Sequence, residues 1–212
     1  MNNILRGKTA IISGVGSRFG SAAAYQLAQL EAKLVLVARN KKLINEVAEK
    51  INKNGGMVDT YVCNTTIGSD VAGLISKIIL KNKSIDILIN NVGGSYTKKK
   101  KLAKMSEDEW DSVINNNIKS TFLMLKNVIP HMELQKKGTI INISAANKTL
   151  VDGNVAYGTA KMGIIGLTKN LAKEYFDKNI RVNCICPGVV REDSKTYNDG
   201  NYNISLLKKG ES

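Results

Sequence analysis

Short apolar runs alternate with longer segments of helical period along the whole chain. The apolar runs lie at residues 8–13, 33–38, 57–63, 86–90, 139–144 and 181–186. Runs such as "LVLVA" and "DILIN" are apolar at successive positions, which is typical of parallel strands covered by helices on both faces. The pattern therefore predicts a doubly wound parallel α/β domain, the Rossmann fold.

Right-handed crossovers leave few arrangements for such a sheet. The order 3-2-1-4-5-6 brings the carboxyl ends of strands one and four together over a crevice, where we expect a ligand to bind. No internal repeat or shift in composition divides the sequence, so we expect a single domain over residues 1–212, with residues 189–212 as a short substrate lid.

Composition narrows the class of protein. The 212 residues are 43% apolar with 18 Gly and 2 Pro, which indicates a folded soluble domain. There is no apolar run of membrane-spanning length, and the amino terminus enters a strand pattern directly, so we expect a cytoplasmic protein without a membrane partner. Cys63, Cys184 and Cys186 lie in apolar runs, where we expect buried reduced thiols and no metal ligands.

The net charge of +13 is concentrated in part at "KKKK", residues 98–101. Such a charge attracts nucleic acid, anionic membranes or acidic small molecules. The interleaved aromatic residues used in single-strand binding are absent there, apart from Tyr96. We therefore interpret the run as a solvated loop, do not expect a nucleic-acid partner, and weakly favour an anionic substrate.

A glycine-rich loop, "SGVGSRFG" at residues 13–20, connects the first strand to the following helix. Glycines permit a tight turn and let a pyrophosphate approach the free N–H groups at a helix N-terminus. The candidate cofactor-binding residues here are Gly14, Ser17, Arg18, Phe19 and Gly20. Strand two ends in "VARN", where Arg39 takes the place of an acid that binds a ribose hydroxyl, so we predict NADP and keep NAD as possible.

Tyr157 and Lys161 are four residues apart in "YGTAK" and share one helix face. A free phenol is too weak an acid to handle protons efficiently near neutral pH, but a nearby cation lowers its pKa. The pair is a candidate proton-transfer site, although this spacing is also common in structural helices.

Taken together, the motifs resemble the short-chain dehydrogenase/reductase family, with 3-oxoacyl-ACP reductases and glucose dehydrogenases as similar types. The resemblance rests on "SGVGSRFG", "NNVG", "NNN", "IINIS", "YGTAK" and "RVNCICPG", in that order over nearly the whole chain. It implies oxidation of alcohols or reduction of ketones with NAD(P)(H), in a homotetramer or homodimer.

The resemblance also assigns residues. Tyr157 would be the acid/base, Lys161 would lower its pKa and bind the nicotinamide ribose, and Asn117 would hold a water of the proton relay. The implied residues along the cofactor crevice are Asn64, Asn91, Gly93, Pro187 and Gly188.

The match is imperfect at several positions. Arg18 stands where the family usually has a glycine of the loop, and Asn64 stands where it has an aspartate that binds adenine. Val92 replaces an alanine of the family pattern, and Glu192 replaces a threonine. The family's catalytic serine falls at Ala145 when strand five is aligned, but at Ser144 when one counts back thirteen residues from Tyr157. We favour Ser144.

We also expect the family's seventh strand to be absent, because the sequence ends soon after strand six. Strand six would then be an exposed edge. We therefore expect an NADP(H)-dependent oxidoreductase acting on a small carbonyl or secondary alcohol. The alternative is a catalytically silent nucleotide-binding or basic scaffold protein.

Overall fold

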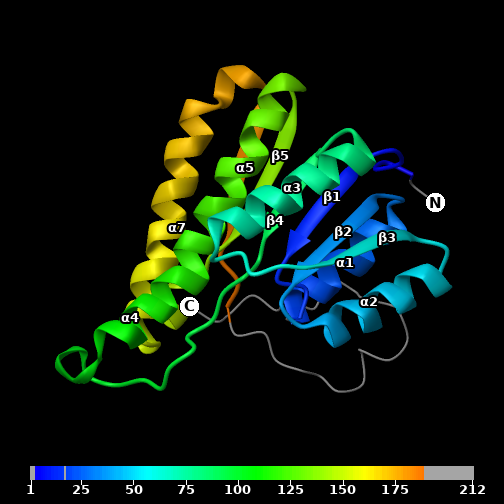
Figure 1. The fold of residues 1–212 in the computed structure, drawn as a ribbon. Helices are drawn as coiled ribbons and strands as arrows, with labels where there is room; N and C mark the ends of the chain where they lie inside the picture. Colours follow the sequence, from blue (N-terminus) through cyan, green and yellow to red (C-terminus); the bar gives the residue numbers. More distant parts are fainter. Residues whose placement is uncertain (1–2, 17, 189–212) are drawn as a thin grey trace.

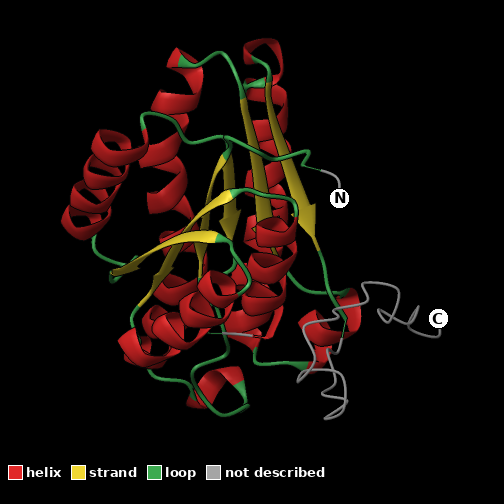
Figure 2. Cartoon of the chain, turned by 90° about the vertical axis from the view of Figure 1, so that its right-hand side faces the viewer, coloured by secondary structure: helices red, strands yellow, loops and turns green. Residues whose placement is uncertain are grey.

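The computed structural model describes residues 3–16 and 18–188, apart from the side chain of Arg18. They form one six-stranded parallel sheet between layers of helices (Figures 1 and 2). The strands are β1 (Thr9–Ser13), β2 (Lys33–Ala38), β3 (Met57–Val62), β4 (Ile87–Asn90), β5 (Gly138–Ile143) and β6 (Ile180–Ile185). Their order, β3-β2-β1-β4-β5-β6, confirms the predicted Rossmann topology.

The sheet reverses its winding direction at β1, which pairs with β2 on one side and β4 on the other. Ser13 and Asn90, the last residues of β1 and β4, are register partners. The chain leaves these two strands toward opposite halves of the sheet, which opens a crevice at their carboxyl ends.

Two hydrophobic cores hold the helices to the sheet, one on each face. α1 (Arg18–Gln29) and α2 (Lys41–Lys53) cover one face. α3 (Gly68–Asn82), α5 (Ser120–Leu134) and α7 (Val155–Glu174) cover the other (Figure 1). Apolar strand residues such as Ile11 and Ile12 point alternately into the two cores, and this explains why the strands are apolar at successive positions.

Shorter helical segments connect these layers. They are η1 (Leu102–Lys104), α4 (Glu107–Ile114), the π-helical turn η2 (Asn115–Lys119), α6 (Asn147–Asp152) and η3 (Phe176–Lys178). α4 begins with a capping box, in which the Ser106 hydroxyl accepts from the Glu109 N–H and the Glu109 carboxylate accepts from the Ser106 N–H. α4 and η2 run directly into α5, so the three form one interrupted helix.

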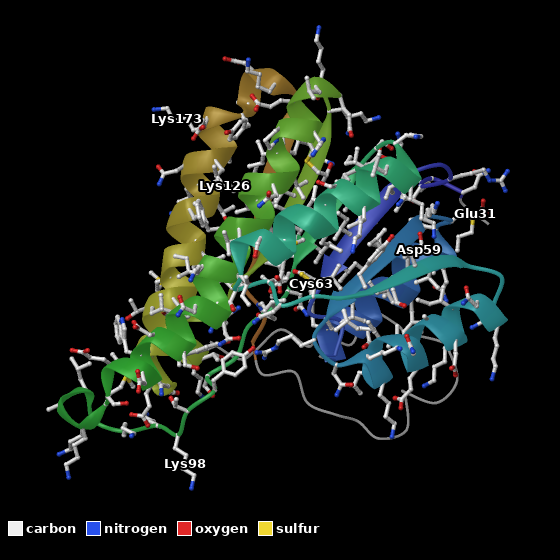
Figure 3. All side chains as sticks on the ribbon, viewed as in Figure 1. Glu31, Asp59, Cys63, Lys98, Lys126 and Lys173 are labelled. Carbon is white, nitrogen blue, oxygen red and sulfur yellow. The ribbon has the colours of Figure 1, made fainter. Side chains whose placement is uncertain are left out.

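β6 lies at an edge of the described sheet, and this corrects the expectation for one cysteine. Cys63 is buried, as expected, and burial raises its pKa to about 11 (Figure 3). Cys184 is half-buried, but Cys186 is exposed because it follows the end of the edge strand. The expected lid, residues 189–212 with Glu192, lies outside the described residues.

The positive charge is spread over the surface. Lys98, Lys126 and Lys173 project outward from three different segments (Figure 3). Within the lysine run, Lys99 donates to the Asp152 carbonyl at 2.7 Å and Lys100 pairs with Glu109 at 2.5 Å. Part of the run therefore contacts its own chain. Among the described helices, none combines the length and the apolar character needed to cross a bilayer.

Candidate active site

The glycine-rich loop packs directly against the loop that follows β4. Gly14 has φ +81°, and a Cβ there would lie 2.6 Å from the Val92 nitrogen. At Gly20, a Cβ would lie 2.7 Å from the Asn91 Nδ2 atom. The Asn91 amide donates to the Gly14 carbonyl at 2.7 Å, so the two loops are tied together at the switch point of the sheet.

Other predicted residues of this loop have different surroundings. Phe19 is partly buried and packs against the core beneath α1 and α2. Ser17 and the side chain of Arg18 lie outside the described part of the structure, and the backbone of Arg18 begins α1. The Ser21 hydroxyl, which sequence reasoning missed, donates to the Val15 carbonyl at 2.7 Å and holds the loop closed.

Lys161 is a buried cation in the middle of the molecule. It is 3% exposed, and its Nζ donates to the Ile143 carbonyl at 2.9 Å. Burial lowers the pKa of Lys161 to about 8, while the nearby Cys184 raises it slightly. The ammonium therefore carries most of its charge at neutral pH but lies close to titration.

Asn117 is fully buried next to Lys161, in the π-helical turn. Its Nδ2 donates to the carbonyls of Gly94 and Val113, each at 2.8 Å, and its Oδ1 accepts from the Gly94 N–H at 3.1 Å. A Cβ at Gly93 would collide with Asn117 Oδ1 and lie 2.7 Å from Lys161 Nζ. Gly93 is thus required by the close approach of both side chains.

Tyr157 lies in the first turn of α7, with the Lys161 Nζ 5.8 Å from its ring centroid. The prediction that Lys161 lowers the pKa of Tyr157 is not met in this structure, because burial raises the pKa of the phenol. The ammonium makes its hydrogen bond to the Ile143 carbonyl and faces the ring of Tyr157. The phenol therefore remains protonated at neutral pH.

The hydroxyl of Ser144 points at the backbone of α7. Its Oγ donates to the Lys161 carbonyl at 2.7 Å, and the residue is 2% exposed. This geometry does not favour the assignment of Ser144 as the serine that contacts substrate. Ala145, which comes next in the chain, is also buried and has no hydroxyl to offer.

A cleft of about 290 Å³ runs beside the switch point. The predicted cofactor residues on its wall are Gly14, Arg39, Asn64, Asn91 and Gly93. Asn64 was expected to accept a hydrogen bond from adenine, but its Oδ1 already accepts from the N–H and the hydroxyl of Thr66, at 3.2 and 2.9 Å. Asn116 and Tyr96 also line the cleft and were not predicted.

Pro187 and Gly188 follow β6 at the same end of the sheet. The Pro187 carbonyl accepts from the Ala146 N–H at 2.9 Å, which ties this segment to the end of β5. Gly188 is exposed.

A buried polar ladder, formed by Asn90, Asn142 and Thr168, holds α7 to the sheet. The Asn90 amide donates to Asn142 Oδ1 at 2.9 Å, and the Asn142 amide donates to the Thr168 hydroxyl at 3.0 Å. All three residues are at most 5% exposed. Sequence reasoning missed Asn142 and Thr168, although an asparagine inside the apolar run "IINIS" was a signal.

The start of α7 is fixed in a similar way. The Asn154 side chain accepts from the Ala156 N–H at 2.9 Å and donates to the Thr97 hydroxyl at 2.7 Å. This cap sets the position of Tyr157 relative to the loop after β4.

The sequence also matches known proteins. The family model for short chain dehydrogenase matches residues 8–202. The chain is a short-chain dehydrogenase. It is 35% identical over 187 residues to a 3-oxoacyl-[acyl-carrier-protein] reductase of Thermotoga maritima, covering 88% of this chain and 75% of that protein.

Solved structures of other short-chain dehydrogenases have the same fold. A metagenomic short-chain oxidoreductase in complex with NADP has a TM-score of 0.81 and 31% identity, covering 88% of this chain and 85% of that one. An NAD⁺-bound xylitol dehydrogenase has a TM-score of 0.81 and 30% identity, covering 87% and 71%. Our protein is accordingly a short-chain NAD(P)-dependent dehydrogenase/reductase.

The residues present fit a dinucleotide. Gly14 and Gly16 of the glycine-rich loop line the cleft, and this cleft connects the ends of β1 and β2 with that of β4, where dinucleotides bind in such sheets. The Oδ1 of Asn116 is buried without a hydrogen-bond partner among the described residues, and Asn116 lines this cleft. An unsatisfied polar atom at a cleft wall is expected where a ligand supplies the missing partner.

Proposed function

We propose that this short-chain dehydrogenase is an NADP(H)-dependent oxidoreductase that transfers hydride between nicotinamide and a carbonyl or secondary alcohol, with Tyr157 as acid/base. The observation that carries the proposal is that Lys161 and Asn117 meet at Gly93, with the Lys161 ammonium 5.8 Å from the centroid of the Tyr157 ring. Burying an ammonium costs free energy, so its placement beside a phenol is best explained by a role in proton transfer.

In the reductive direction, the Tyr157 hydroxyl donates its proton to the substrate oxygen. The raised pKa keeps this proton on the phenol at neutral pH. The Lys161 ammonium, 5.8 Å from the ring centroid, offsets part of the cost that burial places on the phenolate left behind. When bound, the nicotinamide supplies the hydride that reaches the substrate carbon.

The neighbouring residues position this pair. Asn117 fixes the backbone of Gly94 with two hydrogen bonds, while the Ser144 hydroxyl fixes the carbonyl of Lys161. We assign Ser144 a positioning role, and catalysis then proceeds without a serine hydroxyl at the substrate oxygen.

Arg39 supports the choice of NADP. It is exposed at the end of β2 and lines the cleft, where a guanidinium can pair with a 2′-phosphate. The relatives include both an NADP complex and an NAD⁺ complex, so cofactor choice depends on such local residues. We further propose a small carbonyl substrate that carries negative charge, a cytoplasmic location and a homodimeric or homotetrameric assembly.

The decisive test is Tyr157→Phe. Acid/base groups contribute about 10²–10⁴-fold to turnover, so we expect at least a hundredfold loss of kcat in NADPH oxidation by a carbonyl substrate. The NADPH Kd, measured by nicotinamide fluorescence, should stay within about twofold. Tyr175→Phe, one residue beyond α7, is the matched control and should change neither value. Unchanged turnover in Tyr157→Phe would refute the acid/base role.

A second candidate function is nucleotide binding without catalysis. It is favoured by the Ser144 hydroxyl, which bonds the backbone of α7, and by the alanine that follows it. NADPH binding without turnover of any ketone, sugar or 3-oxoacyl thioester would favour this candidate.

A further inference from the structure

Two side chains from different loops meet at the rim of the cofactor cleft. Arg39 follows β2 and Tyr96 lies in the loop after β4. The Arg39 Cζ atom lies 5.8 Å from the centroid of the Tyr96 ring. This distance is within the range of a cation–π contact. Both residues line the cleft, so the contact joins its two sides.

The backbone of Tyr96 is held in an uncommon conformation. Its φ is +50°, in the left-handed region that bulky residues rarely occupy. Such a conformation persists only where surrounding contacts impose it. The left-handed backbone at Tyr96 is thus an observed strain beside a functional cleft.

The ring of Tyr96 lies over Gly94, where an added Cβ would be 3.5 Å from the Tyr96 Cε2 atom. Gly94 in turn is fixed by Asn117, which donates to its carbonyl and accepts from its N–H. The aromatic ring is therefore anchored through two residues to the buried reaction centre, while Arg39 is a long, exposed side chain.

We propose that Tyr96 is a positioning residue that holds the Arg39 guanidinium at the adenosine end of the cleft and thereby sets the preference for NADP over NAD. The inference rests on the proposed function, in which Arg39 pairs with the 2′-phosphate. A flexible arginine loses conformational entropy when it binds a phosphate, and a ring that orders it beforehand reduces this loss.

A different reading is that the contact closes the cleft and must break before a cofactor enters. The cleft retains about 290 Å³ while the contact is formed, so the contact does not fill the space. The positioning role is therefore the better account. The two readings predict opposite effects on affinity when the ring is removed.

The experiment measures the Kd of NADPH and of NADH for the wild type, Tyr96→Leu, Tyr96→Phe, Arg39→Gln and the double variant Arg39→Gln/Tyr96→Leu. Tyr96→Leu should weaken NADPH about two- to fivefold, the value of an exposed cation–π contact, and leave NADH unchanged. Tyr96→Phe retains the ring and should retain wild-type affinity. In the Arg39→Gln background, Tyr96→Leu should have no further effect on NADPH.

The outcomes separate the two proposals. If Arg39→Gln does not change the ratio of the two Kd values, the NADP assignment fails and the role of Tyr96 fails with it. If Arg39→Gln lowers the preference but Tyr96→Leu does not, only the inference about Tyr96 is overturned. Tighter binding of both cofactors by Tyr96→Leu would show that the contact closes the cleft. An unchanged NADH Kd serves as the folding control.

Discussion

The two ends of the cofactor crevice are built in different ways. At the reaction end, Lys161 and Asn117 are at most 3% exposed, and their polar atoms bond to backbone groups. At the adenosine end, Arg39 and Tyr96 are exposed and meet through a ring contact. The reaction end is fixed by buried hydrogen bonds, which are costly to break, whereas the adenosine end is held by exposed contacts worth far less.

Under the proposed function, this difference separates the residues of the chemical step from those that select the cofactor. A buried network tolerates few substitutions, because each leaves a polar group unsatisfied. An exposed pair can change at little cost in stability. We therefore expect variants at the reaction end to lose turnover or stability, and variants at the adenosine end to change cofactor choice.

The largest effect is expected for Gly93→Ala. The added Cβ would collide with Asn117 and lie 2.7 Å from Lys161 Nζ, so both groups must move. Misplacement by about 1 Å costs on the order of 10²-fold in rate, and we expect kcat to fall at least that far. Gly94→Ala is the matched control, because its Cβ meets only the Tyr96 ring, at 3.5 Å. Equal activities of the two variants would contradict a tightly packed reaction end.

Asn142→Leu tests the polar ladder beneath α7. It leaves the amide of Asn90 and the hydroxyl of Thr168 without this partner in the core. The Thr168 hydroxyl keeps its bond to the Ile164 carbonyl, so the unsatisfied group is the Asn90 amide. Such a group costs about 1–3 kcal/mol, and the free energy of unfolding should fall by that amount in urea denaturation. Asn183→Leu, at an exposed position of β6, should change it by less than about 0.5 kcal/mol. A similar loss in both variants would argue against the ladder.

Titration of Lys161 should be visible in stability. Its pKa is about 8 in the folded protein and 10.5 in the unfolded chain, so the unfolded state binds more protons between these values. The contribution of Lys161 to the free energy of unfolding is therefore least favourable below pH 8 and rises as the pH approaches 10.5, by about 3 kcal/mol. The advantage in stability of Lys161→Met over the wild type should shrink across this window. A constant difference would mean that the folded pKa is not lowered.

The smallest effect is expected for Ala145→Ser, which restores a hydroxyl at the position given by aligning strand five. If the enzyme works without a serine at the substrate oxygen, we expect this variant to raise kcat about tenfold, since one such hydrogen bond is worth 10²-fold or more when fully placed. Ser144→Ala should leave kcat within about threefold. A large loss in Ser144→Ala would return the catalytic role to Ser144.

The sequence predicted the fold because short strand-like runs, most of them apolar, alternate with segments of helical period, and this pattern permits few topologies. It also predicted that Tyr157 and Lys161 lie close together on one face of a helix, because residues four apart are neighbours there. It did not predict that Ser144 faces the backbone of α7, because hydrogen bonds across elements leave no periodic signal. Tyr96 was missed for the same reason, since its partner Arg39 is distant in the chain.

The Asn90–Asn142–Thr168 ladder has a consequence for engineering. It fastens α7, the helix that carries Tyr157 and Lys161, to the centre of the sheet using only residues before position 188. Segments from other members of the family can therefore be grafted after that position while α7 keeps its place against the sheet.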